Sequence, residues 1–287
     1  MRYTIFLTSC LLPLAFCLLP LTYSLLPTPC SLKTYNFVAH KLYNCYKSRC
    51  WYKFYGASLV VKSPTPVITQ LPILENGDRL SRVEFERRYH QTPEIRKAEL
   101  IEGVVYVASP VRVNKHGQPH GRIITWLGTY EAATPGIMLC DNSTVRLDFD
   151  NEPQPDALLR IEQDKGGQSR ISEDDYIEGA PELIVEVAAS SASYDLYDKL
   201  RAYRRNGVKE YLVWLTQERK FRWYVLREGE YVQQQPDAGI LSSQVFPGLR
   251  LGVEALLAGK MQQVLAVLQE GIDSEMHQEF VARLASV

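Results

Sequence analysis

A strand, a helix and a second strand follow one another closely in the second half of the chain, and this run constrains the fold more than any other feature. Residues 183–187 are apolar and β-favouring almost throughout, as in strands that are buried on both faces. A stretch with helical spacing of apolar residues follows and ends at Asn206-Gly207, where a left-handed residue can terminate a helix. Residues 211–215 then form another strand. This order predicts a βαβ unit with parallel pairing and a right-handed crossover, and therefore an α/β fold.

The segments around this unit add further strands and helices to it. We place one domain at residues 61–252 and a helical tail at residues 253–287. The pattern predicts a helix at 81–89, where a capping box begins it, and another at 120–134. Hairpins are predicted at 98–107 and 221–233, single strands at 143–149 and 155–161, and a loop at 162–178. The C-terminal segment is predicted to be helical with an interruption near residue 271.

The first 74 residues differ from the rest in composition. They contain no Asp or Glu, and five of the six cysteines lie within the first fifty residues. Residues 4–26 are apolar, but Pro13 and Pro20 would break a helix there, so we expect no stable membrane association unless this stretch is a genuine anchor. Residues 1–60 have three alternative explanations: a secretory signal, a membrane anchor, or translation from a start codon placed too early. We favour translation from an early start codon. The remainder, with Cys140 alone, uses cysteine as a cytoplasmic protein does.

Net charge and motifs argue against several classes of function. A formal net charge of -1 gives no overall signature of nucleic-acid binding, so any contact with DNA must come from a local patch or a metal. The sequence has no P-loop, no dinucleotide-binding glycine turn and no serine-hydrolase elbow. We also expect no zinc site, because we find no pair of histidines or cysteines with zinc-ligand spacing.

Glu186 is the most informative residue, because it interrupts the apolar run at 183–187. An ionised carboxylate buried alone in a strand is costly unless it is paired or binds a cation. A solvated strand end or an arginine partner explains this residue equally well when it is considered alone.

Asp156 adds a second carboxylate. It follows Pro155, starts another apolar strand and lies thirty residues before Glu186. Neighbouring strands can bring two such carboxylates together, and Mg²⁺ is bound by one or two carboxylates with waters and phosphate oxygens. On its own, an aspartate after proline more often marks a turn.

Three other residues are weaker candidates. Lys199 lies at the edge of the apolar stripe of its helix and should point towards the sheet, where an ammonium can orient water or stabilise charge on a phosphate. A lysine whose stem covers apolar surface is the alternative. Glu99 lies in a predicted strand, where an exposed position is the alternative. His120 lies on the inward face of its helix and is better explained as a hydrogen-bonded core histidine.

Several motifs in a fixed order resemble the Uma-type restriction endonucleases, a branch of the PD-(D/E)XK nuclease superfamily. The resemblance covers about residues 73–252, and residues 1–60 have no counterpart in the family. Its motifs are Glu-Leu-Ile-Glu-Gly (99–103), His120, Pro155-Asp156, Pro-Glu-Leu-Ile-Val-Glu-Val (181–187), Asp-Leu-Tyr-Asp-Lys-Leu (195–200), residues 203–214 and Val-Phe-Pro-Gly-Leu (245–249). The resemblance implies a restriction-endonuclease-like α/β fold, with a central mixed β-sheet flanked by helices.

The resemblance also implies roles for four residues. Asp156 and Glu186 are the expected metal-binding acids. Glu99 is the expected accessory acid, and Lys199 the catalytic base or charge stabiliser. The superfamily's lysine two residues after the second acid is replaced here by Ala188, and Lys199 from the next helix is expected to supply the charge. The implied cofactor is Mg²⁺, with Mn²⁺ as a substitute.

We therefore expect a Mg²⁺-dependent endonuclease that hydrolyses phosphodiester bonds in DNA. A domain that keeps the fold and binds nucleic acid or a protein partner without cutting is the main alternative, and a structural protein with ion-paired acids is a third. A homodimer is plausible, because cutting both strands of a duplex needs two sites.

Overall fold

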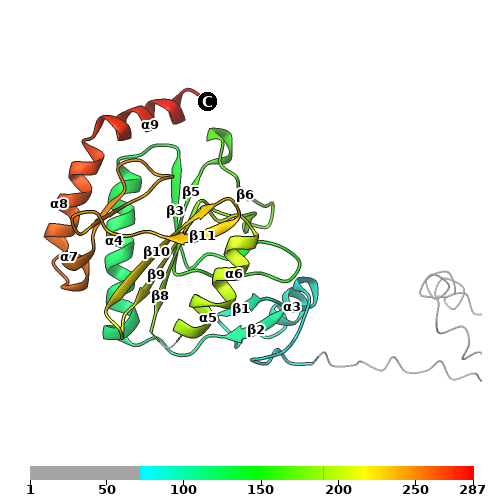
Figure 1. Ribbon diagram of the computed structural model, residues 1–287. Coiled ribbons are helices and arrows are strands. Elements are labelled where there is room, and N and C mark those ends of the chain that lie inside the picture. Colours follow the sequence, from blue (N-terminus) through cyan, green and yellow to red (C-terminus); the bar gives the residue numbers. More distant parts are fainter. Residues whose placement is uncertain (1–71, 190) are drawn as a thin grey trace, which may run out of the picture. The chain divides into compact units, whose positions relative to one another are not determined.

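A six-stranded mixed sheet forms the centre of the computed structural model, which describes residues 72–189 and 191–287 (Figure 1). The strand order across the sheet is β11-β10-β9-β8-β5-β3. The bounds are β3 Ile137–Asp141, β5 Ala157–Ile161, β8 Leu183–Ala188, β9 Glu210–Leu215, β10 Lys220–Arg227 and β11 Glu230–Gln233. The predictions for residues 1–60, including a signal or anchor at 4–26, lie outside the described residues. Among the described residues, no helix is long and apolar enough to cross a membrane.

The βαβ unit is present as expected. Strands β8 and β9 pair in parallel, whereas the other pairings in this sheet are antiparallel. Two short helices connect them, α5 Ala192–Leu196 and α6 Asp198–Arg205. Gly207 follows α6 with a φ of 82°, and its N–H donates to the carbonyl of Arg204. The helix therefore ends in the predicted left-handed manner. The mixed α/β fold class is confirmed.

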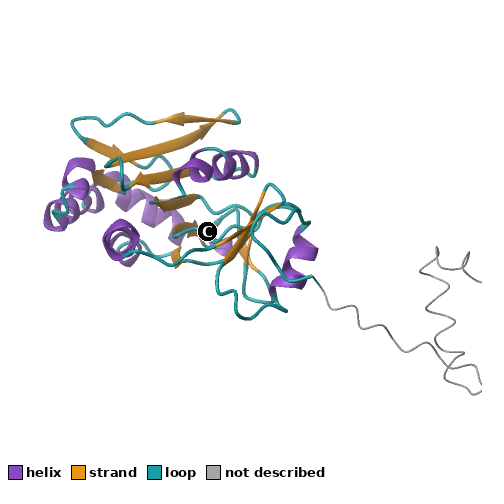
Figure 2. Cartoon of the chain, turned by 90° about the horizontal axis from the view of Figure 1, so that it is seen from below, coloured by secondary structure: helices purple, strands orange, loops and turns teal. Residues whose placement is uncertain are grey.

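Helices cover both faces of the sheet (Figure 2). One face packs on α4 Gln118–Ala132 and on the C-terminal helices, and the other packs on α5 and α6. Strand β8 contributes to both cores, because alternate side chains of a strand point to opposite faces. Val185 lies in the first core, and Ile184 lies in the second with Tyr203. Glu186 therefore faces α6.

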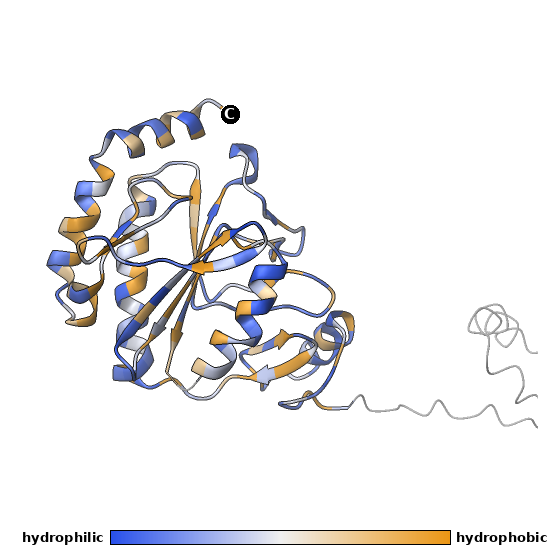
Figure 3. Ribbon diagram, in the orientation of Figure 1, coloured by the Kyte–Doolittle hydropathy of each residue, from blue (hydrophilic) through white to orange (hydrophobic). Residues whose placement is uncertain are grey.

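The helical segment 253–287 is packed into the first core. It comprises α7 Val253–Leu257, α8 Met261–Ile272 and α9 Glu275–Ala285. Buried Val264, Leu268 and Phe280 belong to the same cluster as Trp126 of α4. Hydrophobic residues alternate with hydrophilic ones on these helices, as the colouring of Figure 3 shows.

A hairpin and a short helix form a third, smaller core. The hairpin consists of β1 Ala98–Ile101 and β2 Val104–Val107, and its turn has positive φ at Glu102 and Gly103 (52° and 72°), as expected for a tight hairpin turn. Helix α3, Arg82–Tyr89, packs on this hairpin through Phe85. Ser81 stands at the N-cap without a side-chain hydrogen bond, so the helix forms where predicted but the capping box does not.

Two expectations for the middle of the chain are wrong. Within 143–149 only β4, Val145–Arg146, is a strand, and the expected loop at 162–178 contains a 3-10 turn, η4 Gln163–Lys165, and two short strands, β6 Arg170–Ile171 and β7 Ile177–Glu178. Strand β7 pairs with both β4 and β6. These strands exist through pairing between distant segments, which the local pattern does not encode. Two further features were not predicted. One is the edge strand β3, and the other is a small sheet of β12 Ile240–Ser242 with β13 Arg250–Gly252.

Candidate active site

Strands β5 and β8 place Asp156 and Glu186 side by side. The strands pair antiparallel with Ala157 opposite Val185, and one further step in this register puts Asp156 opposite Glu186. Opposite residues point to the same face, with Cβ atoms about 5 Å apart. The backbone N–H of Val187 donates a hydrogen bond of 2.8 Å to Asp156 Oδ2 and holds the two strand ends together. Both carboxylates are at most 5% exposed.

Lys199 joins two of the predicted site residues. It is only 1% exposed, and its Nζ lies 2.8 Å from Glu99 Oε1 and 2.8 Å from Glu186 Oε1. The backbone N–H of Gln154 donates to the same oxygen of Glu99 (2.7 Å). Glu99 is thus buried rather than exposed on its strand, and the ammonium of Lys199 does not reach solvent. The structure brings together Glu99, Glu186 and Lys199, with Asp156 on the adjacent strand.

Asp195 and Tyr203 also contact this group. Asp195 Oδ1 lies 3.8 Å from Lys199 Nζ, and the Tyr203 hydroxyl donates a hydrogen bond of 2.8 Å to Glu186 Oε1. Sequence reasoning assigned neither residue to the site. The signal was their spacing, because Asp195 lies four residues before Lys199 and Tyr203 four residues after it. Lys199 and Tyr203 share one side of α6, whereas Asp195 lies in the preceding helix, α5. We call Glu99, Asp156, Glu186, Asp195 and Lys199 the acid cluster.

Asp156 is held ionised by its neighbours. Burial by itself raises the pKa of this carboxyl, but the hydrogen bond and charge of His116, the charge of Lys97 and the N–H of Val187 lower it to about 2. His116 Nε2 lies 3.1 Å from Asp156 Oδ2, and Lys97 Nζ lies 3.8 Å from Oδ1. The side chains of His116 and Lys97 are 22% and 29% exposed, so they mark the side on which the acid cluster meets solvent. Neither residue was identified from the sequence.

The rest of the acid cluster carries more negative than positive charge. Burial raises the pKa of Glu186 to about 8; the charge of Lys199 opposes this shift, and the neighbouring carboxylates add to it. Burial likewise raises the pKa of Asp195 to about 6. Although burial lowers the pKa of Lys199, the charges of Glu186 and Glu99 hold it well above its ordinary value. With one buried ammonium among four carboxylates, the acid cluster favours the uptake of a proton or of another cation.

The donor set fits a hard divalent cation. Within the described residues, Asp156 accepts hydrogen bonds through Oδ2 and Glu186 through Oε1, which leaves one oxygen of each carboxylate outside these bonds. The described part of the chain contains no group of three or more His, Cys, Asp or Glu side chains arranged to hold a metal. Two carboxylates are nevertheless enough for Mg²⁺, which usually keeps several waters and binds substrate phosphates.

His120 has a supporting contact at this site. Its Nε2 donates to the backbone carbonyl of Asp156 (2.8 Å) and lies 3.0 Å from Asp141 Oδ1. It is therefore hydrogen-bonded as expected, although it is half-buried rather than in the core. The expectation that no histidine pair has zinc-ligand spacing is wrong, because His116 and His120 are four residues apart and their ring centroids lie 5.8 Å from each other. Both histidines contact Asp156 and restrict its position.

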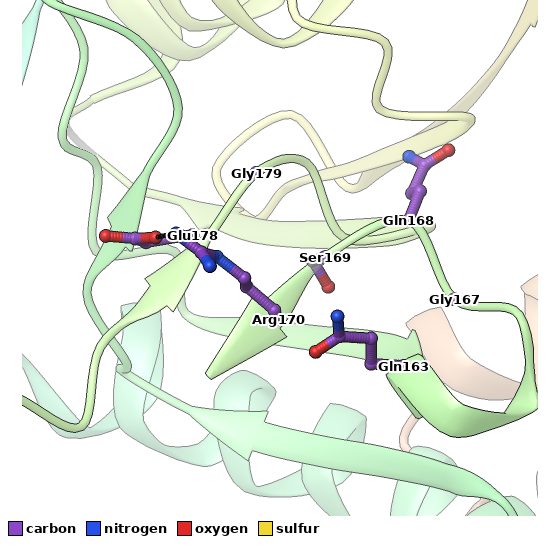
Figure 4. A pocket seen from close by; sticks show the side chains of 7 residues that line it. All are labelled: Gln163, Gly167, Gln168, Ser169, Arg170, Glu178 and Gly179. Carbon is purple, nitrogen blue, oxygen red and sulfur yellow. Dashed lines mark hydrogen bonds and ion pairs between the residues drawn. The ribbon is translucent and has the colours of Figure 1, made fainter. Parts of the chain in front are cut away.

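A solvent-open pocket of about 340 Å³ lies in another part of the protein (Figure 4). Its walls come from η4, β6, β7 and the turns between them, and they include the ion pair of Arg170 with Glu178. The complete lining is Gln163, Gly167, Gln168, Ser169, Arg170, Glu178 and Gly179. Because no member of the acid cluster lines it, this pocket is separate from the candidate site.

Comparison with known proteins gives one family match. The family model of Uma2, described as "Putative restriction endonuclease", matches residues 83–254, which include all four predicted site residues. No match was found among the curated proteins. The solved structures include a similar chain, described as a "putative nuclease belonging to DUF820" from Anabaena variabilis ATCC 29413, with 14% sequence identity and a TM-score of 0.47. The similarity covers 60% of this chain and 96% of that one. The family match spans more than half of the chain and confirms the resemblance found in the sequence: this protein belongs to the Uma2 family.

Proposed function

We propose that this protein is a Mg²⁺-dependent endonuclease that hydrolyses phosphodiester bonds in DNA. One observation carries the proposal: two buried carboxylates, Asp156 and Glu186, lie opposite each other on adjacent strands, and burial together with the neighbouring carboxylates raises the pKa of Glu186. Buried like charges are costly to keep ionised unless a cation joins them. Membership of the Uma2 family, whose description names a restriction endonuclease, supports a nucleic-acid substrate.

Asp156 and Glu186 would hold the cation, and Mn²⁺ should replace Mg²⁺ because both accept carboxylate and water ligands. A divalent cation bound there polarises a phosphate oxygen and lowers the pKa of the attacking water. Lys199 stays protonated, since its pKa is raised, and this favours charge stabilisation over the role of a general base. Glu99 accepts a hydrogen bond from the ammonium of Lys199 and fixes its position.

A domain that binds nucleic acid or a protein partner without cutting is the second candidate function. The closed state of the acid cluster favours it, because Glu186 is 3% and Lys199 1% exposed. A phosphate group reaches these side chains only after neighbouring groups move aside. A nuclease must therefore open its site, whereas a binding domain need not.

Plasmid cleavage tests the proposal directly. The full-length protein is incubated with supercoiled plasmid and Mg²⁺ or Mn²⁺, beside the Asp156→Ala and Glu186→Ala variants. Asp164→Ala is the matched control, because Asp164 is 74% exposed in its side chain and lies outside the acid cluster. We expect nicking by the wild type and the control, and none by the two site variants or with a chelator.

Two results would overturn this reading. If the wild type does not nick, or if nicking survives both site substitutions, the non-cutting domain becomes the better explanation.

The cleavage products also report on assembly. A homodimer that cuts both strands should give linear plasmid at a rate that rises steeply with protein concentration, whereas a monomer should give mainly nicked circles.

A further inference from the structure

Residues 108–117 form an exposed segment between β2 and α4, which we call the basic arm. In Figure 1 it runs along the lower edge of the described unit, past α5 to the start of α4. Both of its ends are fixed: the N–H of Ala108 donates to the carbonyl of Lys97 (3.0 Å), and Thr216 Oγ1 donates to the carbonyl of Lys115 (2.7 Å). Residues 108–115 between these two points are exposed without interruption. The arm is thus a protruding segment with fixed ends.

The basic arm leads directly into the acid cluster. Its last five residues, Val113–Gly117, form a π-helical turn (η3), in which the N–H groups of His116 and Gly117 both donate to the carbonyl of Arg112. Turns of this type are frequent at functional sites. This turn places His116 Nε2 3.1 Å from Asp156 Oδ2. A molecule bound along the arm therefore lies next to the expected metal ligands.

The charge of the basic arm is opposite to that of the body. The arm carries Arg112 and Lys115, and no Asp or Glu occurs between Glu102 and Glu131. All 33 acidic residues of the chain lie from Glu75 onward, whereas seven of the 32 lysines and arginines lie before residue 72. The body is therefore acidic overall and repels a polyanion. A local cationic segment beside the acid cluster is what a nucleic acid would need in order to approach.

The side chains of the basic arm are free to contact a ligand. Within the described residues, the side chains of Arg112 and Lys115 make no hydrogen bond or ion pair. Val111 and Val113, on either side of Arg112, are 66% and 75% exposed. Proteins that bind the minor groove of DNA often combine arginine or lysine with apolar side chains that contact the groove. Neither charge nor apolar surface is used within the described fold.

We infer that the basic arm is the element that holds duplex DNA against the acid cluster. Arg112 and Lys115 contact phosphates on either side of the groove, and Val111 and Val113 lie against the groove wall. This inference rests on the proposed function, because it supplies the substrate-binding surface of the same site. The phosphate contacts set affinity and register, and His116 marks the point where the strand reaches Asp156.

Binding measured without cleavage tests the inference. Fluorescence anisotropy with a labelled 20-base-pair duplex in a chelator compares the wild type with the double variant Arg112→Ala/Lys115→Ala. The control, Lys260→Ala/Arg283→Ala, removes the same charge from exposed positions in the C-terminal helical segment. We expect the arm variant to bind at least about tenfold more weakly at moderate salt, and the slope of log K against log[salt] to fall by about 2. The control should stay within about twofold of the wild type.

The outcomes separate this inference from the nuclease proposal. Three results would overturn the role of the basic arm. The arm variant binds duplex as tightly as the wild type, the control loses as much affinity as the arm variant, or the wild type does not bind duplex at all. If the arm variant loses binding but the wild type never nicks plasmid, the arm is supported and the nuclease proposal fails.

A second double variant, Val111→Ser/Val113→Ser, tests the groove contact. It should reduce binding of duplex more than binding of single strands, and an equal reduction contradicts the groove contact. Because all four side chains are exposed, each variant should unfold at the wild-type temperature, which shows that it is folded.

Discussion

The acid cluster differs from a second group of carboxylates, of which only Glu152 is buried, in how its charges are balanced. In the second group, which we call the arginine cluster, the guanidinium of Arg146 lies within 4.0 Å of Glu86, Glu152, Asp174 and Glu178. Glu152 is buried in it, and burial together with the adjacent Glu86 raises the pKa of Glu152 to about 8. Both groups thus hold a carboxyl that takes up a proton near neutral pH.

Solvent and additional cations distinguish the two groups. In the arginine cluster the side chain of Asp174 is 56% exposed, Arg82 lies 3.6 Å from Glu86, and Arg170 pairs with Glu178. In the acid cluster the carboxylates are at most 7% exposed in their side chains, and Lys199 is the only buried cation that contacts them among the described residues. Buried acids therefore do not by themselves indicate a metal site, and we expect a cation at the group that has fewer charged partners and less water around it.

The largest difference should appear when each central cation is removed. Lys199→Met leaves buried carboxylates without a partner and should lower the free energy of unfolding by about 3–5 kcal/mol. Arg146→Met should cost only about 1–2 kcal/mol, because water and Arg82 remain near its partners. Urea unfolding at pH 7 in a chelator measures both. Equal losses would show that the two groups are balanced in the same way.

A pH titration should isolate the arginine cluster. Because the folded state raises the pKa of Glu152 from 4.5 to about 8, it favours the protonated carboxyl. This contribution to stability is complete below pH 4.5 and is lost as the pH rises through about 8. Between pH 5 and 9 the wild type should lose about 4 kcal/mol more than Glu152→Gln. Parallel pH curves for the two proteins would contradict the assignment.

Cation binding should affect only the acid cluster. At ten times its dissociation constant, Mg²⁺ should stabilise the wild type by about 1.4 kcal/mol, and Glu152→Gln by the same amount. Glu186→Gln keeps the shape of the side chain but removes a ligand charge, so it should lose this gain. Thermal unfolding with and without Mg²⁺ gives the answer. Stabilisation that persists in Glu186→Gln but disappears in Glu152→Gln would move the metal site to the arginine cluster.

The smallest effect is expected at the rim of the arginine cluster. The side chain of Arg170 is 62% exposed and pairs with Glu178 at the surface. Arg170→Ala should change the free energy of unfolding by no more than about 1 kcal/mol, because exposed ion pairs are screened by water. Added salt should reduce this effect further. A loss as large as that of Lys199→Met would mean that solvent does not relieve this cluster.

The elements that form the scaffold of the site could be read from the sequence because their signals are local. The apolar run of β8 and the glycine after α6 predict the βαβ unit, and a carboxylate within that run identifies Glu186. The contacts of Lys97 and His116 with Asp156 could not be read, since they join segments that are far apart in the chain. The short strands β4, β6 and β7 were missed or misplaced for the same reason.

The position of Glu99 has a consequence for how the site opens. Glu99 belongs to the β1–β2 hairpin, which packs with α3 in a core of its own, and its bond to Lys199 is one of the points that attach this hairpin to α6. We expect a substrate phosphate that binds the ammonium of Lys199 to compete with Glu99 and so to weaken this attachment. In that case the hairpin would separate from α6 as the substrate binds, because both contacts use the same ammonium. Binding of the substrate and release of the hairpin would then be thermodynamically coupled. A stronger bond between Glu99 and Lys199 would protect the buried acids but lower the affinity for the substrate.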